Sequence, residues 1–331
     1  MEVKDVEMRD RTLTPARLFR GLLCLLVLLL TAFMMLVFYG FISAIFVRVF
    51  SIHYSRKATS FFFGSWLAVW PFLFEKINKT KVIFSGEMVP ARERVLIIAN
   101  HRTEVDWMYL WDLAIRKGQL GYIKYILKSS LMKLPVFGWG FHILEFISVE
   151  RKWEVDESTM RQMLSTFKDD HDPLWLALFP EGTDFTEQKR IRSQKYAAEN
   201  GLPILKNLLL PKTKGFHTCV QDLRQCLDAE NEVANWLMDT FSNKDQLLDK
   251  FHSQGHFPHE GTEGDLSTMK CLVSITTLMV LTSLSTYLTF FSSIWFKIYV
   301  LFACSYLAFA TRFNIRPMPI FRRKKIVLKL D

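Results

Sequence analysis

The sequence has few cysteines, and they do not form a pattern that binds metal or builds a disulfide framework. There are five in 331 residues, and none belongs to a C-x-x-C pair. Cys24, Cys271 and Cys304 lie in or beside apolar segments, which is typical of reduced thiols packed as small hydrophobic side chains. We therefore expect no metal site, no cofactor, and active groups that face the cytosol rather than an oxidising lumen.

The motifs of two further function classes are also missing. No G-x-S-x-G elbow occurs, which makes a hydrolase the least favoured type of enzyme. Neither a zinc-finger spacing nor a tract rich in Arg and Gly is present, so we expect no nucleic-acid partner. Acidic residues are in the minority, with 33 Asp and Glu against 42 Lys and Arg, and the net charge of +9 suits work on an anionic membrane surface.

Long apolar runs near the N-terminus predict membrane helices. After a polar segment, residues 1–20, the run Gly21–Val47 is almost wholly apolar and long enough to cross a hydrocarbon core of about 30 Å. Phe61–Phe74 is shorter and contains Pro71, which favours an interfacial or re-entrant helix. We expect residues 21–76 to form a helical hairpin that holds the protein against the bilayer.

A second pair of apolar runs lies near the C-terminus. Met269–Phe291 and Ile294–Phe309 are separated by two serines, an arrangement that predicts a transmembrane hairpin. The basic run Arg322–Lys325 indicates that the tail is cytosolic and close to anionic head groups. Residues 269–331 are therefore assigned to this hairpin and tail, and residues 231–268 to a helical connector.

The middle of the chain, residues 79–230, has the pattern of an α/β domain. Short β-rich runs alternate with helical stretches, which predicts a mostly buried, partly parallel mixed sheet covered by helices. The predicted strands are Lys81–Ser85, Val95–Ala99, Tyr122–Leu127, Phe146–Val149, Trp175–Phe179 and Leu208–Leu210. The predicted helices are Asp156–Lys168, Glu187–Asn200 and Thr218–Leu227, with Val233–Phe251 in the connector.

His101 and Asp106 follow the predicted strand Val95–Ala99 and are the main candidates for chemistry. A His at a strand end with an Asp one helical turn later can hold the carboxylate against one imidazole nitrogen, which leaves the other free to take a proton. A substrate hydroxyl deprotonated in this way can attack a thioester directly. His217 and Asp222 have the same spacing, but no strong strand precedes them and we expect no function there.

The motif Phe-Pro-Glu-Gly-Thr at residues 179–183 follows another predicted strand. Gly182 allows close approach of the backbone to a ligand, and the amides of Gly182 and Thr183 can face a phosphate. The alternative is an ordinary strand-to-helix turn with Thr183 as its cap.

Cations follow two more strands. Arg151 comes after Phe146–Val149, and Lys212 and Lys214 come after Leu208–Leu210. Both residue types bind phosphate, although each also occurs as a solvated surface charge. Motifs at successive strand ends match the place where open α/β sheets build ligand sites.

Together these motifs resemble the glycerolipid acyltransferase family over nearly the whole chain. The likeness is strongest to the 1-acyl-sn-glycerol-3-phosphate acyltransferases, especially plant members, and to their lysocardiolipin and lysophosphatidylinositol relatives. It implies acyl-CoA as donor, a lysophospholipid as acceptor, and His101 and Asp106 as the catalytic pair. The substrate-binding residues that it implies are Arg151, Glu181, Gly182, Thr183, Lys212 and Lys214.

Three departures from the family pattern bear on function. Asp184 stands where many members carry Arg after Glu-Gly-Thr, and the motif before Arg151 keeps only that Arg. The span from Phe216 to Trp236 is shorter than in relatives, where additional strands separate these positions. A shortened isoform with exposed sheet edges is one reading of this span.

The resemblance implies a multi-pass protein of the endoplasmic reticulum membrane that converts lysophosphatidic acid to phosphatidic acid. Two alternatives remain open. One is the same chemistry on lysophosphatidylinositol or lysocardiolipin, and the other is an inactive shortened isoform that acts as a membrane interaction protein.

Overall fold

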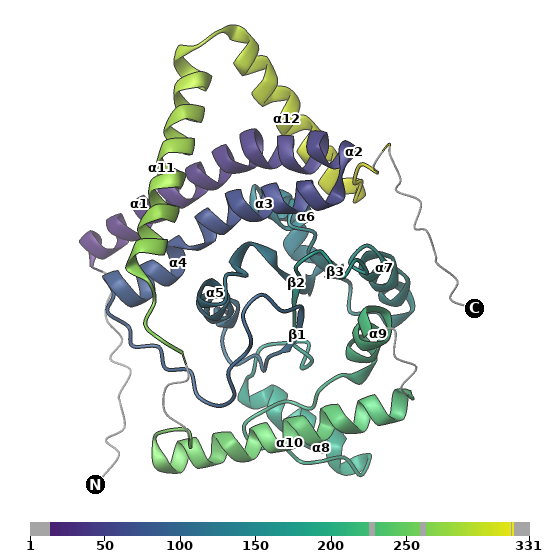
Figure 1. The fold of residues 1–331 in the computed structure, drawn as a ribbon. Helices are drawn as coiled ribbons and strands as arrows, with labels where there is room; N and C mark the ends of the chain where they lie inside the picture. The colour runs from purple at the N-terminus through teal and green to yellow at the C-terminus, as the bar shows by residue number, and fades with distance from the viewer. Residues whose placement is uncertain (1–13, 225–228, 259–262, 319, 321–331) are drawn as a thin grey trace.

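A computed structural model of the chain describes residues 14–224, 229–258, 263–318 and 320. A sheet lies at its centre, surrounded by helices, and the apolar helices α11 (Thr268–Phe291) and α12 (Ile294–Phe313) form a hairpin that projects away from it (Figure 1). The predicted basic tail, Arg322–Lys325, lies outside the described residues.

The sheet contains four strands in the order β1-β4-β2-β3. They are β1 (Val95–Ile98), β2 (Ile123–Lys128), β3 (Ile147–Val149) and β4 (Trp175–Leu178). The α/β class is confirmed, and all pairings among the described strands are parallel, so that the sheet is more uniform than the mixed one predicted. Every residue of the central strand β4 is buried, which explains its continuous apolar sequence.

Two of the predicted strands are wrong. Residues 81–85 alternate in exposure as a strand would, yet they pair with no described strand, and Phe84 lies under the Arg116 guanidinium at 5.0 Å. Residues 208–210 are irregular although Leu208 and Leu209 are buried, and the Leu210 amide donates to Ser193 Oγ at 2.9 Å. An apolar run indicates burial, but it does not supply the neighbouring strand that a ladder needs.

Helices cover both faces of the sheet. They are α5 (Asp106–Arg116), α6 (Phe137–Ile143), α7 (Trp153–Ser165), α8 (Glu187–Glu199), α9 (Thr213–Arg224) and α10 (Glu230–Gln254), with the short turns η4 (Leu120–Tyr122) and η5 (Ser129–Lys133). The helices predicted in this region are all present with shifted bounds, apart from residues 225–227, which lie outside the described residues. One apolar cluster joins α7 and α9 to β3 and β4, and another joins α10 to the segment around Leu208.

The N-terminal apolar run is helical throughout. It comprises α1 (Pro15–Met34), the π-helical stretches η1 (Met35–Gly40) and η2 (Ile42–Val47), and α2 (Arg48–Phe50). Gly21–Phe50, α11 and α12 are three helices long and apolar enough to cross a membrane. The expected apolar helices at both ends of the chain are therefore present.

A second helical segment returns along the first and lies between it and the sheet (Figure 1). It consists of α3 (Ile52–Leu67), α4 (Val69–Phe72) and η3 (Leu73–Ile77). α3 approaches η4 so closely that a Cβ added at Gly121 would lie 2.1 Å from the carbonyl oxygen of Ser60. This contact fixes the distance between the N-terminal helices and the domain.

We expect Gly121→Ala to lower the thermal unfolding midpoint of the detergent-solubilised protein. The added methyl group meets backbone rather than a flexible side chain, so that overpacking is expected to cost about 1–3 kcal/mol. Gly264→Ala is the control, because nothing lies within 4 Å of its Cβ position. Equal midpoints for the two variants would contradict close α3–η4 packing.

Candidate active site

His101 and Asp106 are held together where β1 passes into α5. Their side chains meet at 3.1 Å between Nδ1 and Oδ2, and Asp106 is the first residue of α5. The carboxylate also accepts hydrogen bonds from the Thr103 amide at 2.8 Å and the Thr103 hydroxyl at 2.7 Å. Asp106 therefore has a fixed orientation, while Nε2 of His101 has no hydrogen-bond partner among the described residues.

The electrostatics of the pair favour a charged imidazole. The hydrogen bond to Asp106 raises the pKa of His101, and partial burial opposes this increase only in part. Burial would by itself raise the pKa of Asp106, but the hydrogen bonds from His101 and Thr103 outweigh it and lower that pKa. An imidazole in this setting gains basicity at the nitrogen that faces away from the carboxylate.

That imidazole lies on the wall of a cavity of about 1760 Å³. Seven of the eight predicted site residues line it, namely His101, Arg151, Glu181, Gly182, Thr183, Lys212 and Lys214. Asp106 is not among the lining residues, but it is hydrogen-bonded to His101, which is. The structure thus brings together motifs that are separated by more than a hundred residues.

The cavity is polar around His101 and apolar further along. Its apolar wall includes Leu36 of η1, Trp66 of α3 and Trp70 of α4, together with Gly140 and Phe141 of α6. The N-terminal helices and the domain therefore line the same cavity. Its shape suits a ligand with a polar reacting end and a long apolar tail.

Glu181 links two of the motifs. Its side chain is 3% exposed, and Oε1 accepts a hydrogen bond from the backbone amide of His101 at 3.3 Å. Burial raises the pKa of Glu181 to about 7, and Oε2 has no hydrogen-bond partner among the described residues. The neighbouring Gly182 adopts a φ of +70°. Pro180 accepts a hydrogen bond from the Lys212 amide at 2.9 Å, which joins the Phe-Pro-Glu-Gly-Thr motif to the segment that carries Lys212 and Lys214.

Arg151 is presented by a constrained loop. Its φ is +65°, an uncommon value for a residue with a side chain. Asp156 on α7 holds this conformation by accepting hydrogen bonds from the amides of Glu150 at 2.6 Å and Lys152 at 2.9 Å. Sequence reasoning missed Asp156, although an acidic residue in the first turn of a helix is a recognisable cap.

Two further cations on α8 were also missed. Lys189 and Arg192 line the cavity, and Lys189 Nζ contacts the Thr183 hydroxyl at 2.9 Å and Asp184 Oδ1 at 2.8 Å. Asp184, which replaces an expected Arg, thus forms an ion pair with a Lys of the next helix. Lys189, Arg192 and Tyr196 recur at helical spacing on the cavity side, a periodicity that a search of the sequence could have detected.

The second His/Asp pair has no such setting. Both residues lie on α9 and neither lines the cavity. Asp222 lies within ion-pair distance of Arg161 and Lys168 instead, at 3.5 and 3.7 Å. The spacing alone is therefore uninformative.

Comparisons with known proteins agree with these motifs. Residues 81–227 match the family model described as Acyltransferase, and residues 221–283 match the model described as Acyltransferase C-terminus. No solved structure gives a significant match.

The chain is 57% identical over its full length, and over 99% of the relative, to an Arabidopsis thaliana protein named probable 1-acyl-sn-glycerol-3-phosphate acyltransferase 5. It is 38% identical to lysocardiolipin acyltransferase 1 of Gallus gallus over 62% of this chain and 54% of that protein. A 1-acyl-sn-glycerol-3-phosphate acyltransferase 2 of Brassica oleracea is 33% identical over 57% of this chain and 60% of its own length. The chain therefore belongs to the acyltransferase family and is a transferase.

Proposed function

We propose that the protein transfers a fatty acyl group from acyl-CoA to the free hydroxyl of lysophosphatidic acid, producing phosphatidic acid. The observation that carries this proposal is the His101–Asp106 pair, which opens with its free nitrogen into a cavity that has a cationic and an apolar part. The name of the full-length Arabidopsis relative favours this acceptor.

In the proposed mechanism, Nε2 of His101 removes the proton from the acceptor hydroxyl. The hydroxyl oxygen forms an ester bond with the thioester carbon as the carbon–sulfur bond breaks. The thiolate then takes the proton from His101 and leaves as the free thiol. Asp106 stabilises the imidazolium between these two transfers, and no covalent intermediate on the protein is needed.

The two parts of the cavity suit the two ends of the substrates. Arg151, Lys212 and Lys214 offer cations for phosphate groups of the acceptor or of CoA, and Lys189 and Arg192 add to them. The apolar wall accommodates an acyl chain. The apolar helices at both ends support a membrane location, and we assign the protein to the endoplasmic reticulum with its active site towards the cytosol.

A second acceptor is favoured by the similarity to lysocardiolipin acyltransferase 1. The chemistry would be identical, and only the groups around the head group would differ. Assays with lysophosphatidic acid, lysophosphatidylinositol and lysocardiolipin in parallel distinguish these acceptors. The absence of transfer to all three from a folded protein would favour the inactive-isoform alternative.

His101→Ala should lower acyl transfer from oleoyl-CoA to lysophosphatidic acid by at least about 100-fold, the usual contribution of a general base. His217→Ala is the matched control, because His217 lies outside the cavity. Release of the free thiol and formation of phosphatidic acid are both measured. Full activity of a folded His101→Ala protein would refute the mechanism.

The acid limb of kcat/KM should lie above pH ~6.5, the pKa of an unperturbed imidazole. A raised pKa keeps His101 protonated, and therefore inactive as a base, up to a higher pH. Asp106→Asn removes the main cause of that increase, so that the limb should move to lower pH while the maximal rate falls. Asp239→Asn, at an exposed position on α10, should leave the limb in place. An unchanged limb in Asp106→Asn would argue against the coupling.

Gly140→Leu should change the preferred length of the acyl donor. A Cβ at Gly140 would lie 3.7 Å from Leu36 Cδ2, so that a leucine side chain would fill the apolar part of the cavity. The rate with oleoyl-CoA should fall relative to that with lauroyl-CoA, whereas Gly140→Ala makes only an ordinary contact and should change the ratio little. A ratio unaffected by Gly140→Leu would place the acyl chain elsewhere.

A further inference from the structure

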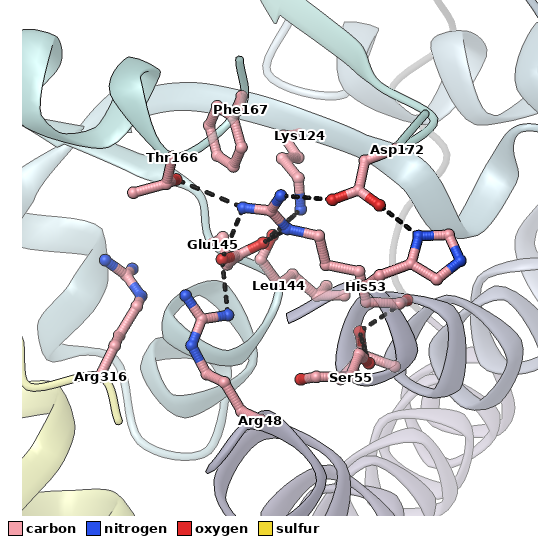
Figure 2. Close-up of polar contacts among 12 residues, drawn as sticks. Arg48, His53, Ser55, Lys124, Leu144, Glu145, Thr166, Phe167, Asp172 and Arg316 are labelled. Carbon is pink, nitrogen blue, oxygen red and sulfur yellow. Dashed lines mark hydrogen bonds and ion pairs between the residues drawn. The ribbon is translucent and has the colours of Figure 1, made fainter. Parts of the chain in front are cut away.

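A cluster of charged side chains, all buried except the half-buried Arg316, lies where the first apolar helix, α3 and the domain meet (Figure 2). It contains four cations and two carboxylates that come from separate parts of the chain. These are Arg48, Arg56, Lys124 and Arg316, with Glu145 and Asp172. None of them lines the catalytic cavity.

Glu145 is the centre of this cluster. It is 3% exposed and accepts hydrogen bonds from Arg48 and Arg56, each at 2.8 Å, and from Lys124 at 3.3 Å. Asp172 Oδ2 accepts a hydrogen bond from Nη1 of Arg56, also at 2.8 Å. Burial lowers the pKa of Lys124 to about 8, because the surroundings do not fully compensate its charge.

Among the described residues, no carboxylate makes an ion pair with Arg316. Within the part of the chain that the structure describes, its Nη atoms reach only Met163 Sδ and the carbonyl oxygen of His142. Its Nε is buried and finds no hydrogen-bond partner in the described part of the chain. Burial lowers the pKa of Arg316 to about 10; the charge of Glu145 opposes this decrease, and those of Arg48 and Arg56 add to it.

The cluster therefore has a surplus of positive charge. Glu145 and Asp172 cannot balance four cations, and His53, which contacts Asp172, adds a further donor on the exposed side. A buried charge without a partner is costly, so that a site of this kind favours an anion. Arg offers a planar pair of donors that fits a phosphate group.

Both Arg48 and Arg316 lie at ends of candidate membrane helices. Arg48 is in the last turn of the segment Gly21–Phe50, and Arg316 follows α12 by three residues. The two ends are joined, because Arg48 Nε donates to the carbonyl oxygen of Pro317 at 3.1 Å. Residues at these positions lie at the level of the lipid head groups, where anionic phospholipids attract basic side chains.

We propose that Arg316, together with Arg48, binds the phosphate group of an anionic membrane phospholipid at the junction of α2 and α12. The lipid supplies the negative charge that the described residues lack there. This site is separate from the catalytic cavity, and it ties the position of the domain to the composition of the bilayer.

The test compares the full-length protein with Arg316→Gln and, as matched control, Arg312→Gln, which removes an exposed cation from the last turn of α12. Thermal midpoints are measured in detergent alone and with short-chain phosphatidylglycerol, short-chain phosphatidylcholine or inorganic phosphate. Phosphatidylglycerol should raise the midpoint of the parent and of Arg312→Gln. Its apparent Kd should be about tenfold weaker for Arg316→Gln, the loss expected for one charge-assisted hydrogen bond.

The detergent-only measurement separates a lipid site from a purely structural role. Since Arg316→Gln removes an uncompensated cation, its midpoint without lipid should equal or exceed that of the parent, and the order should reverse with phosphatidylglycerol. Equal responses of Arg316→Gln and the parent to phosphatidylglycerol would overturn the proposal. A response to inorganic phosphate as large as that to phosphatidylglycerol would overturn the lipid as the source of the phosphate.

If Arg316→Gln does not fold, Arg316→Lys is compared instead, with phospholipid retention measured by native mass spectrometry. Lysine at this position keeps the charge but lacks the planar pair of donors. The amount of phosphatidylglycerol that Arg316→Lys retains should therefore be lower than the amount that the parent retains, but above zero. Retention equal to the parent's would refute the bidentate contact.

Discussion

The parallel direction of the four strands is the constraint on which the candidate site depends. All carboxyl ends lie at one edge of the sheet, so that residues following β1, β3 and β4 converge although the chain separates them widely. The hydrogen bond from the His101 amide to Glu181 is the most direct consequence, since β1 and β4 are neighbours. The position of Glu181 is thus set by backbone pairing, and its buried carboxylate in turn fixes the turn that carries the imidazole.

The motifs at strand ends could be predicted because they depend on local sequence. β1 and β4 are short apolar runs followed at once by polar residues, and the α/β class follows from this alternation. The features that the sequence did not predict correctly depend on contacts with residues far away in the chain. Residues 81–85 have the alternation of a strand but no neighbouring strand among the described residues, and the role of Asp156 depends on the unusual backbone conformation at Arg151. Glu145 gives no local signal at all, because its partners Arg48 and Arg56 come from another part of the chain.

The same cluster explains how apolar helices are joined to a domain that has its own core. Apolar packing alone allows a helix to slide or rotate, whereas a buried carboxylate that holds Arg48 and Arg56 at 2.8 Å fixes one arrangement. Removing one partner of such a buried pair typically costs about 3–5 kcal/mol, because the other charge is left uncompensated. The apolar wall of the cavity consists partly of residues on these helices, so that their position also determines the shape of the site.

The short span before α10 raises the question of whether the sheet is left open. The alignment with the Arabidopsis relative covers 373 positions against the chain's 331 residues, so that the relative contains residues without a counterpart here. Among the described strands β1 pairs with β4 alone, but Lys244 of α10 donates to the Ile98 carbonyl at 2.7 Å. The adjacent Asp245 accepts the amides of Lys206 and Asn207. α10 therefore bonds a backbone carbonyl of β1 and two amides of the adjacent loop, so that the end of β1 is supported without a further strand.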